Sequence, residues 1–292
     1  DFKNDSLIPY PELGANLCID CFDAHRYKDK LYYPILNHAS GNCRDTSLPF
    51  HDNNSWLLVF NKDLQPAFPP KINRGFTSQV FTRLFYADDS LMGVSYFHTI
   101  DAYDSLDYLF KFNMQGKFLD TICFKNKEYR RLFVMNTAQG PRILLNTFDT
   151  IMVYNSDLEI IKRVCIPGFC TSYTSIQDID NDAFEELIIL NYHTERIEVY
   201  TNKLEHPVST PMSFNDTFYK VSKAKFGDAT ELLAVNTDKY LYGLEYSRNK
   251  WYYMKYLVFV GIFLSIALLM LLLLRIQRKG MERKEINRKQ LL

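Results

Sequence analysis

An acidic segment at residues 178–186 holds the residue types best suited to bind a metal ion. It reads Asp-Ile-Asp-Asn-Asp-Ala-Phe-Glu-Glu, and its carboxylates at relative positions 1, 3, 5 and 9 belong to Asp178, Asp180, Asp182 and Glu186. Alternating Asp side chains in a tight loop can surround one cation, and hard oxygen ligands suit Ca²⁺. We therefore predict a structural Ca²⁺ site here. The alternative is a solvated acidic turn whose side chains cap backbone groups.

The predicted cation site occurs once, although the segment around it belongs to a repeat. At an offset of 45 residues its three aspartates are replaced by Lys223, Lys225 and Gly227. Only one repeat can therefore bind an ion in this way, and the ion would support the fold rather than catalysis.

Other residues with potential chemistry form no strong pattern. Cys18 and Cys21 have the spacing of a zinc ribbon, but no second Cys pair of that kind follows. Cys165 and Cys170 can either close a small disulfide loop or remain free thiols. The six histidines form no local ligand pair, and the chain has no Walker A motif, GxSxG motif or kinase catalytic loop. No catalytic residues are predicted.

The elements that would position the acidic loop follow a regular repeat. Three β-rich segments align on Asn146, Asn191 and Asn236, which are spaced 45 residues apart, and two looser copies precede them at 56–66 and 108–124. Each copy contains a predicted strand whose last residue is aromatic and is followed by a polar turn. These closing aromatics are Phe60, Phe112, Tyr154, Tyr200 and Tyr246.

A repeat of this length has room for about four short strands, which is typical of a β-propeller blade. In the fourth repeat the strands are expected at Ser172–Gln177, Leu187–Asn191, Arg196–Thr201 and Pro207–Phe214. We predict an all-β propeller of four-stranded blades, of which five are visible, and the total is left open because a cut N-terminus would remove blades. A β-sandwich is the alternative, but the fixed spacing argues against it. The five predicted blades cover 12–72, 73–124, 129–166, 171–214 and 218–250.

The segment Tyr256–Leu274 is predicted to be a transmembrane helix. Its 19 residues carry no charge, and at 1.5 Å per residue they extend about 28 Å, close to the ~30 Å hydrocarbon core of a bilayer. The aromatic residues at 251–253, together with Tyr256 at its start, form an interfacial belt, and Arg275 follows its last residue. A buried core helix is the alternative, which these flanks disfavour.

The charge pattern predicts the orientation in the membrane. The net charge of the chain is zero. The segment after the predicted helix nevertheless carries a charge of +5, because it contains seven basic residues and only two acidic ones, Glu282 and Glu285. By the positive-inside rule the C-terminus is cytoplasmic and the β-domain extracytoplasmic, in a single-pass protein of the cell membrane. The basic residues can contact anionic lipid, and no nucleic-acid footprint is present. They are Arg275, Arg278, Lys279, Arg283, Lys284, Arg288 and Lys289.

The acidic segment resembles the D-x-D-x-D-G-x-x-E loop of FG-GAP and VCBS repeats, which build integrin-α-like propellers. The resemblance covers about 15 residues well and the surrounding repeat loosely. It implies Ca²⁺ binding by Asp178, Asp180, Asp182 and Glu186. The chain departs from the motif at Ala183, where the family has the Gly that helps the sharp turn.

Three regions are expected: an extracytoplasmic β-propeller at 1–250, a transmembrane helix with its aromatic belt at 251–275, and a basic juxtamembrane helix at 276–292. This architecture resembles the sensor half of bacterial membrane receptors, above all propeller-bearing sensor histidine kinases. It implies that the propeller senses a ligand or a partner protein and signals, through a helix pair in a homodimer, to an output domain beyond Leu292. The alternatives are an anchored adhesion or binding propeller without signalling, and an extracytoplasmic enzyme on a propeller scaffold.

Overall fold

The computed structural model divides the chain into two units, Asp1–Glu245 and Tyr246–Leu292. The described strands all lie in the first unit, and the second contains one long helix. The residues that the structure describes are 18–21, 24–39, 50–75, 77–99, 106–125, 130–169, 172–205, 207–211, 218–226, 230–237, 241–244 and 254–289.

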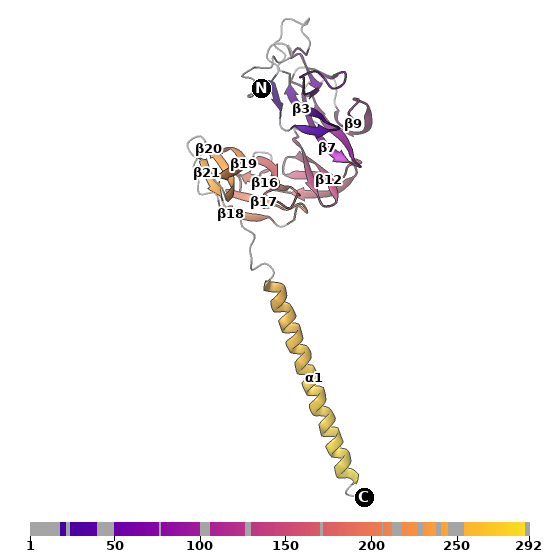
Figure 1. Ribbon diagram of the computed structural model, residues 1–292, viewed down its shortest axis with the longest axis vertical. Coiled ribbons are helices and arrows are strands. Elements are labelled where there is room, and N and C mark those ends of the chain that lie inside the picture. Colours follow the sequence, from indigo (N-terminus) through magenta and orange to yellow (C-terminus); the bar gives the residue numbers. More distant parts are fainter. Residues whose placement is uncertain are drawn as a thin grey trace. The chain divides into compact units, whose positions relative to one another are not determined.

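The first part of the β-unit contains one large antiparallel sheet and a small one (Figure 1). The large sheet has the order β1-β3-β7-β8-β9-β10, with β2 and β5 also paired to β3, and the small sheet pairs β4 with β6. The bounds are β1 (Cys18–Cys21), β2 (His25–Tyr27), β3 (Lys30–His38), β4 (Asn54–Leu57), β5 (Val59–Asn61), β6 (Lys71–Arg74), β7 (Gln79–Ala87), β8 (Ser90–His98), β9 (Asp107–Asn113) and β10 (Phe118–Phe124).

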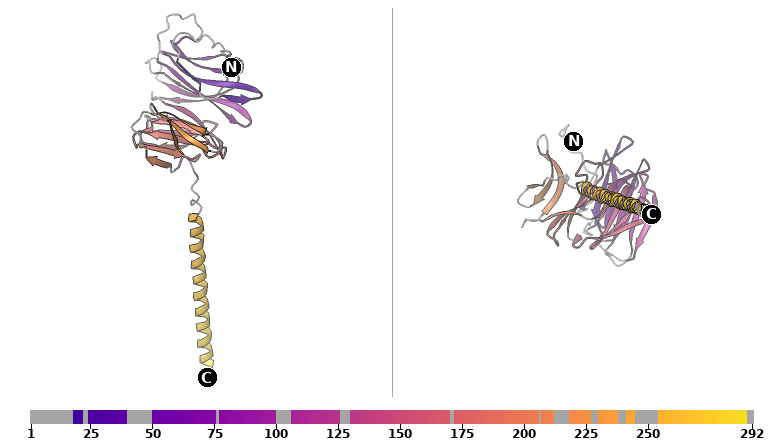
Figure 2. Two further views of the ribbon diagram at one scale, coloured as in Figure 1. Left: turned by 60° about the vertical axis from the view of Figure 1, so that its left-hand side comes forward. Right: turned by 90° about the horizontal axis from the view of Figure 1, so that it is seen from below.

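The second part is more regular, with two four-stranded sheets and a three-stranded one, each an antiparallel meander in chain order. The sheets follow one another along the β-unit as they do in the sequence, from magenta to orange (Figure 2). Their strands are β11 (Leu132–Thr137), β12 (Gly140–Thr147), β13 (Thr150–Tyr154), β14 (Ile160–Cys165), β15 (Tyr173–Gln177), β16 (Glu186–Asn191), β17 (Arg196–Tyr200), β18 (Val208–Pro211), β19 (Phe218–Phe226), β20 (Thr230–Thr237) and β21 (Leu241–Leu244).

The strand predictions hold best in the fourth repeat, where β15, β16, β17 and β18 lie within the expected segments or start one residue before them. The all-β class is confirmed. The two earliest repeats are not separate, because β3 hydrogen-bonds to β7 at Asn37–Val80 and His38–Gln79 and joins them into one sheet.

One turn conformation recurs with the sequence repeat. After each of four closing aromatics, the carbonyl of an Asn or Thr accepts a hydrogen bond from the N–H three residues later, and that later residue has a positive φ. The three Asn side chains each accept two further backbone N–H groups, which is ordinary Asx-turn chemistry. The residue pairs are Asn61–Leu64, Asn113–Gly116, Asn155–Leu158 and Thr201–Leu204.

The core lies between successive sheets. Tyr154 and Leu158 from the end of β13 pack with Phe85, Tyr96 and Leu109 of the large sheet in one cluster. A second cluster joins the sheet β11–β14 to the sheet β15–β18 in the same manner, with Tyr200 and Leu204 among its members. Tyr154 and Tyr200 therefore each help to bind their own sheet to the preceding one.

Helix α1 (Met254–Lys289) forms the second unit and contains the predicted span. The stretch Tyr256–Met281 is long and apolar enough to cross a membrane, and its large apolar side chains are exposed. The Ser265 hydroxyl donates to the Gly261 carbonyl at 2.8 Å, so this polar group is satisfied within the helix. The helix continues through Gly280 into the charged segment, so the predicted anchor and juxtamembrane segment are one element of about 54 Å.

Gly93 provides a test of the core packing. It lies opposite Phe112 in the β8–β9 register, and a Cβ added at Gly93 would lie 2.0 Å from Cζ of the Phe112 ring. We predict that Gly93→Ala lowers the free energy of unfolding by about 1–3 kcal/mol, the usual cost of overpacking a well-packed core. Urea unfolding of the full chain in detergent, followed by near-UV circular dichroism, measures it.

A double-mutant cycle with Phe112→Leu is the control. If the ring is what the new methyl group meets, the double variant loses less stability than the sum of the two single variants. Additive losses would show that Phe112 is not the limiting contact.

Candidate functional site

The acidic loop between β15 and β16 brings three of its four predicted ligands together. One carboxylate oxygen from each of Asp178, Asp180 and Glu186 lies within 4.8 Å of the others. Two oxygens on opposite sides of a Ca²⁺ ion at about 2.4 Å would be that far apart, so the donor set fits the ion, with backbone carbonyls or water needed to complete its shell. Asp182 is outside this group, and its carboxylate accepts a hydrogen bond from the Phe184 N–H at 2.9 Å.

The loop backbone reaches its sharp turn without glycine. Asn181 and Ala183 have φ values of 60° and 70°. Asn adopts this left-handed region readily, whereas for Ala it costs about 1–2 kcal/mol. The Asp178 carboxylate accepts hydrogen bonds from the N–H groups of Asp182 and Ala183 at 3.2 and 3.0 Å, which holds the turn closed. The departure from the family motif at Ala183 is therefore accommodated by the fold.

Glu186 is the buried member of the group. It begins β16, and its carboxylate accepts a hydrogen bond from the Ile179 N–H at 3.1 Å. Burial, reinforced by the negative charges of Asp180, Asp182 and Asp178, raises the pKa of Glu186 to about 7. A cation beside these carboxylates would counteract both effects by favouring the ionised form.

The loop is also tied to the neighbouring sheet. Asn136 of β11 donates its N–H to the Glu185 carboxylate at 2.6 Å, and the Glu185 N–H donates to the Asn136 carbonyl at 2.9 Å. Glu185 therefore links the acidic loop directly to the adjacent sheet.

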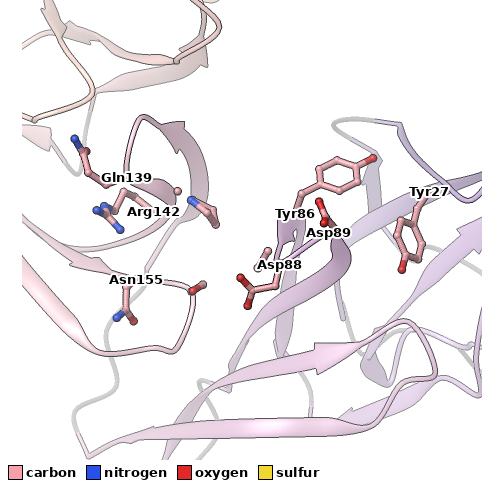
Figure 3. A pocket seen from close by; sticks show the side chains of 11 residues that line it. Tyr27, Tyr86, Asp88, Asp89, Gln139, Arg142 and Asn155 are labelled. Carbon is pink, nitrogen blue, oxygen red and sulfur yellow. The ribbon is translucent and has the colours of Figure 1, made fainter.

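A cavity of about 740 Å³ lies in the β-unit away from the acidic loop. One wall comes from the large sheet, with Tyr27 at the end of β2, Tyr86 at the end of β7 and the β7–β8 turn residues Asp88 and Asp89. The opposite wall belongs to the next sheet, and Figure 3 shows Gln139, Arg142 and Asn155 on the other side of the opening from Asp88. This second wall includes Gln139, Arg142, Asn155 and Ser156.

Two-residue hairpin turns shape the first wall. Asp88 and Asp89 have φ values of 46° and 57°, as the type I′ turn of a tight hairpin requires. The Tyr86 hydroxyl donates to the Arg26 carbonyl. A hydrogen bond from Lys28, with a further one from Ser90, lowers the pKa of the Tyr27 phenol. The wall is therefore held by backbone geometry and by contacts between two hairpins.

A buried polar network lies in the large sheet. The Asp107 carboxylate accepts from the Tyr96 hydroxyl at 2.5 Å and meets Nδ1 of His98 at 3.0 Å, with all three residues buried. Burial works against ionisation of Asp107, but its bonds to His98 and Tyr96 lower the pKa below its usual value. This network joins β8 to β9.

Sequence reasoning missed the cavity, because its walls come from turns far apart in the chain. The one local signal is the acidic pair Asp88–Asp89, and such a pair is equally typical of an ordinary polar turn. Two cysteines in the described part of the chain, Cys123 and Cys165, are free thiols, and both are exposed. Cys170, the other half of the disulfide considered for Cys165, lies outside the described residues.

Comparison with known proteins identifies a fold but no family. No family model and no curated protein matches the sequence. One similar solved structure is a protein of unknown function from Bacteroides caccae, with 10% identity, a TM-score of 0.41 and coverage of 76% of this chain and 71% of that one. A second is BBS1N, solved in complex with ARL6DN, with 10% identity, a TM-score of 0.53 and coverage of 82% and 68%.

The likeness to BBS1N concerns the fold alone. Together with the successive antiparallel meanders, it defines the first unit as a β-propeller-like domain. The chain thus combines a propeller-like domain with one helix able to span a membrane.

The strained Ala183 backbone gives a direct test of the loop geometry. Ala183→Gly removes the left-handed penalty but adds conformational freedom to the unfolded chain. We predict a net gain of about 0.5–1 kcal/mol in the free energy of unfolding, measured by urea denaturation without added metal. Ala138, an exposed turn residue without a positive φ, is the matched control, and Ala138→Gly should lose stability. A loss at both positions would contradict the loop conformation.

Proposed function

We propose that this chain is the extracytoplasmic sensing region and membrane anchor of a single-pass receptor. The observation that carries the proposal is the direct succession of a propeller-like domain and one apolar helix that continues, without a break, into a basic segment. A simple anchor needs only the apolar part. A helix that extends past the span supports transmission of a shift or rotation to whatever follows it.

The proposed orientation rests on charge. The part of α1 that follows the predicted span Tyr256–Leu274 carries Arg275, Arg278 and Lys279, which favour the cytoplasmic side and can contact anionic lipid headgroups. The β-unit is then extracytoplasmic, where the polar turns of its four-stranded blades would recognise a ligand or partner protein.

Signalling through the membrane requires at least two helices that can move against each other, so we propose a homodimer through α1 and a histidine-kinase-type output domain beyond the C-terminus. The second candidate is an adhesion or binding propeller whose helix only anchors it. The exposed apolar outer-strand residues Ile160, Ile161 and Val208 favour that reading, because such residues can serve partner contact.

Cysteine labelling in bacterial spheroplasts tests the orientation. A membrane-impermeant maleimide should modify the exposed native thiols Cys123 and Cys165 in intact spheroplasts, with sites mapped by mass spectrometry. A cysteine introduced as Arg278→Cys should react only after permeabilisation. Labelling of Arg278→Cys in intact cells, with protection of Cys123, would reverse the proposed topology.

Disulfide cross-linking of introduced cysteines distinguishes the proposed receptor from a binding protein whose helix is only an anchor. Single cysteines placed in turn at 276–281 should form disulfide-linked dimers with a periodicity of 3–4 residues, because one helix face meets its partner. Cross-linking without any preferred face would favour the anchored binding protein. Labelling at Cys123 in the same samples reports whether the β-unit keeps its accessibility.

We also propose that the acidic loop binds one structural Ca²⁺. The proximity of the Asp178, Asp180 and Glu186 oxygens supports it, as does the buried carboxylate of Glu186 among negative charges. The ion would neutralise the loop and strengthen the Glu185–Asn136 link to the neighbouring sheet.

Calcium should stabilise the full chain in a pH-dependent manner. At pH 8 and a Ca²⁺ concentration about 100-fold above Kd, linkage predicts about 2.7 kcal/mol, or a rise in Tm of about 5–10 °C for a chain of this size. EDTA should reverse it. The rise should shrink as the pH falls below about 7, where the Glu186 carboxyl takes up a proton in competition with the ion.

Glu186→Gln is the matched variant. Without metal, the raised pKa of Glu186 means that its contribution to stability is present below pH 4.5 and is lost as the pH rises towards 7. The Gln variant should therefore lose this pH dependence and also lose most of the Ca²⁺ effect. An unchanged Tm with Ca²⁺ in the parent chain would leave the loop as a solvated acidic turn.

A further inference from the structure

The cavity between the β7–β8 turn and the next sheet has walls of opposite charge. Asp88 and Asp89 place two exposed carboxylates on one side, and Arg142 of β12 places a half-buried guanidinium on the other. The close-up shows the two groups across the opening from each other (Figure 3). Within the described part of the chain, the Arg142 side chain forms no ion pair or hydrogen bond with the protein.

The remaining lining suits a peptide rather than an apolar molecule. The side chains of Gln139, Asn155 and Ser156 can both donate to and accept from amide groups. The ring of Tyr86 borders the acidic wall and can contact a cationic side chain through its face. The Tyr27 ring already has the Lys28 ammonium over it, at 5.0 Å from the ring centroid. The volume of about 740 Å³ lies within the ~300–1,000 Å³ range of small-molecule sites.

The cavity is held in shape by the fold around it. The Asp88–Asp89 turn is fixed by its left-handed backbone, and the two sheets that supply the walls share the core cluster containing Phe85, Tyr96 and Tyr154. An occupant that touches both walls would therefore bridge two sheets, and its binding would stabilise their contact.

We propose that this cavity binds short peptides with a basic N-terminal residue and a free C-terminal carboxylate. Two carboxylates against one guanidinium match a ligand with two cationic groups at one end and one anion at the other. Arg142 receives the carboxylate in a charge-assisted fork, and Asp88 and Asp89 receive the N-terminal ammonium and the basic side chain. The inference rests on the proposed sensing function and names the ligand class for it.

Isothermal titration of the full chain in nanodiscs with the tripeptide Lys-Gly-Gly tests the proposal. We expect saturable binding that weakens as salt rises. Arg142→Ala and Asp88→Asn should each weaken it by about tenfold, as is usual for the loss of a charge-assisted hydrogen bond. Arg163→Ala, an exposed arginine in the same sheet, is the matched control and should leave the affinity unchanged.

Variants of the peptide test whether Arg142 recognises its C-terminal carboxylate. The C-terminal amide of Lys-Gly-Gly should lose affinity against the parent chain but not against Arg142→Ala. Equal binding of the acid and the amide, or undiminished binding by both cavity variants, would overturn the proposal. Absence of binding by the parent chain would overturn it as well, while the cysteine labelling of the helix would still decide the receptor proposal by itself.

Discussion

Packing between successive sheets through the closing aromatic is the interaction on which the β-unit depends. Tyr154 and Tyr200 end the third strand of their sheets and lie in the cores shared with the preceding sheet. The leucine four residues after each tyrosine, Leu158 or Leu204, has a positive φ. This left-handed conformation costs about 1–2 kcal/mol for a residue other than glycine. Burial of its side chain, worth about 1.5–3 kcal/mol, offsets that cost, so the turn and the core stabilise each other.

The sequence predicted the later repeats well because their signals are local. The aromatic-Asn turn and the alternating strands around it depend on neighbours in the chain, so β15–β18 could be placed from spacing alone. The pairing of β3 with β7 could not, since it joins segments about 40 residues apart through only two residue pairs, Asn37–Val80 and His38–Gln79. The cavity escaped prediction for the same reason, because Asp88 and Arg142 meet only after two sheets have packed.

The acidic loop shows how a motif can be read too strictly. The family motif has Gly at position 183 because the turn needs a positive φ there. In this chain Ala183 adopts that positive φ, and the Asp178 carboxylate caps the turn. The spacing located the three carboxylates that converge, but it assigned Asp182 to them as well. Asp182 instead caps Phe184, since side-chain direction in a short loop depends on hydrogen bonds that spacing does not encode.

The cores are shared between neighbours, with one cluster joining the large sheet to β11–β14 and another joining β11–β14 to β15–β18. Cohesion in such an array is a sum of nearest-neighbour terms. In the proposed receptor, a mechanical load between α1 and a bound partner would enter at the three-stranded sheet β19–β21, the last described sheet before the helix. The array would then yield sheet by sheet rather than all at once, so the molecule would lengthen in steps while its earlier sheets kept their fold.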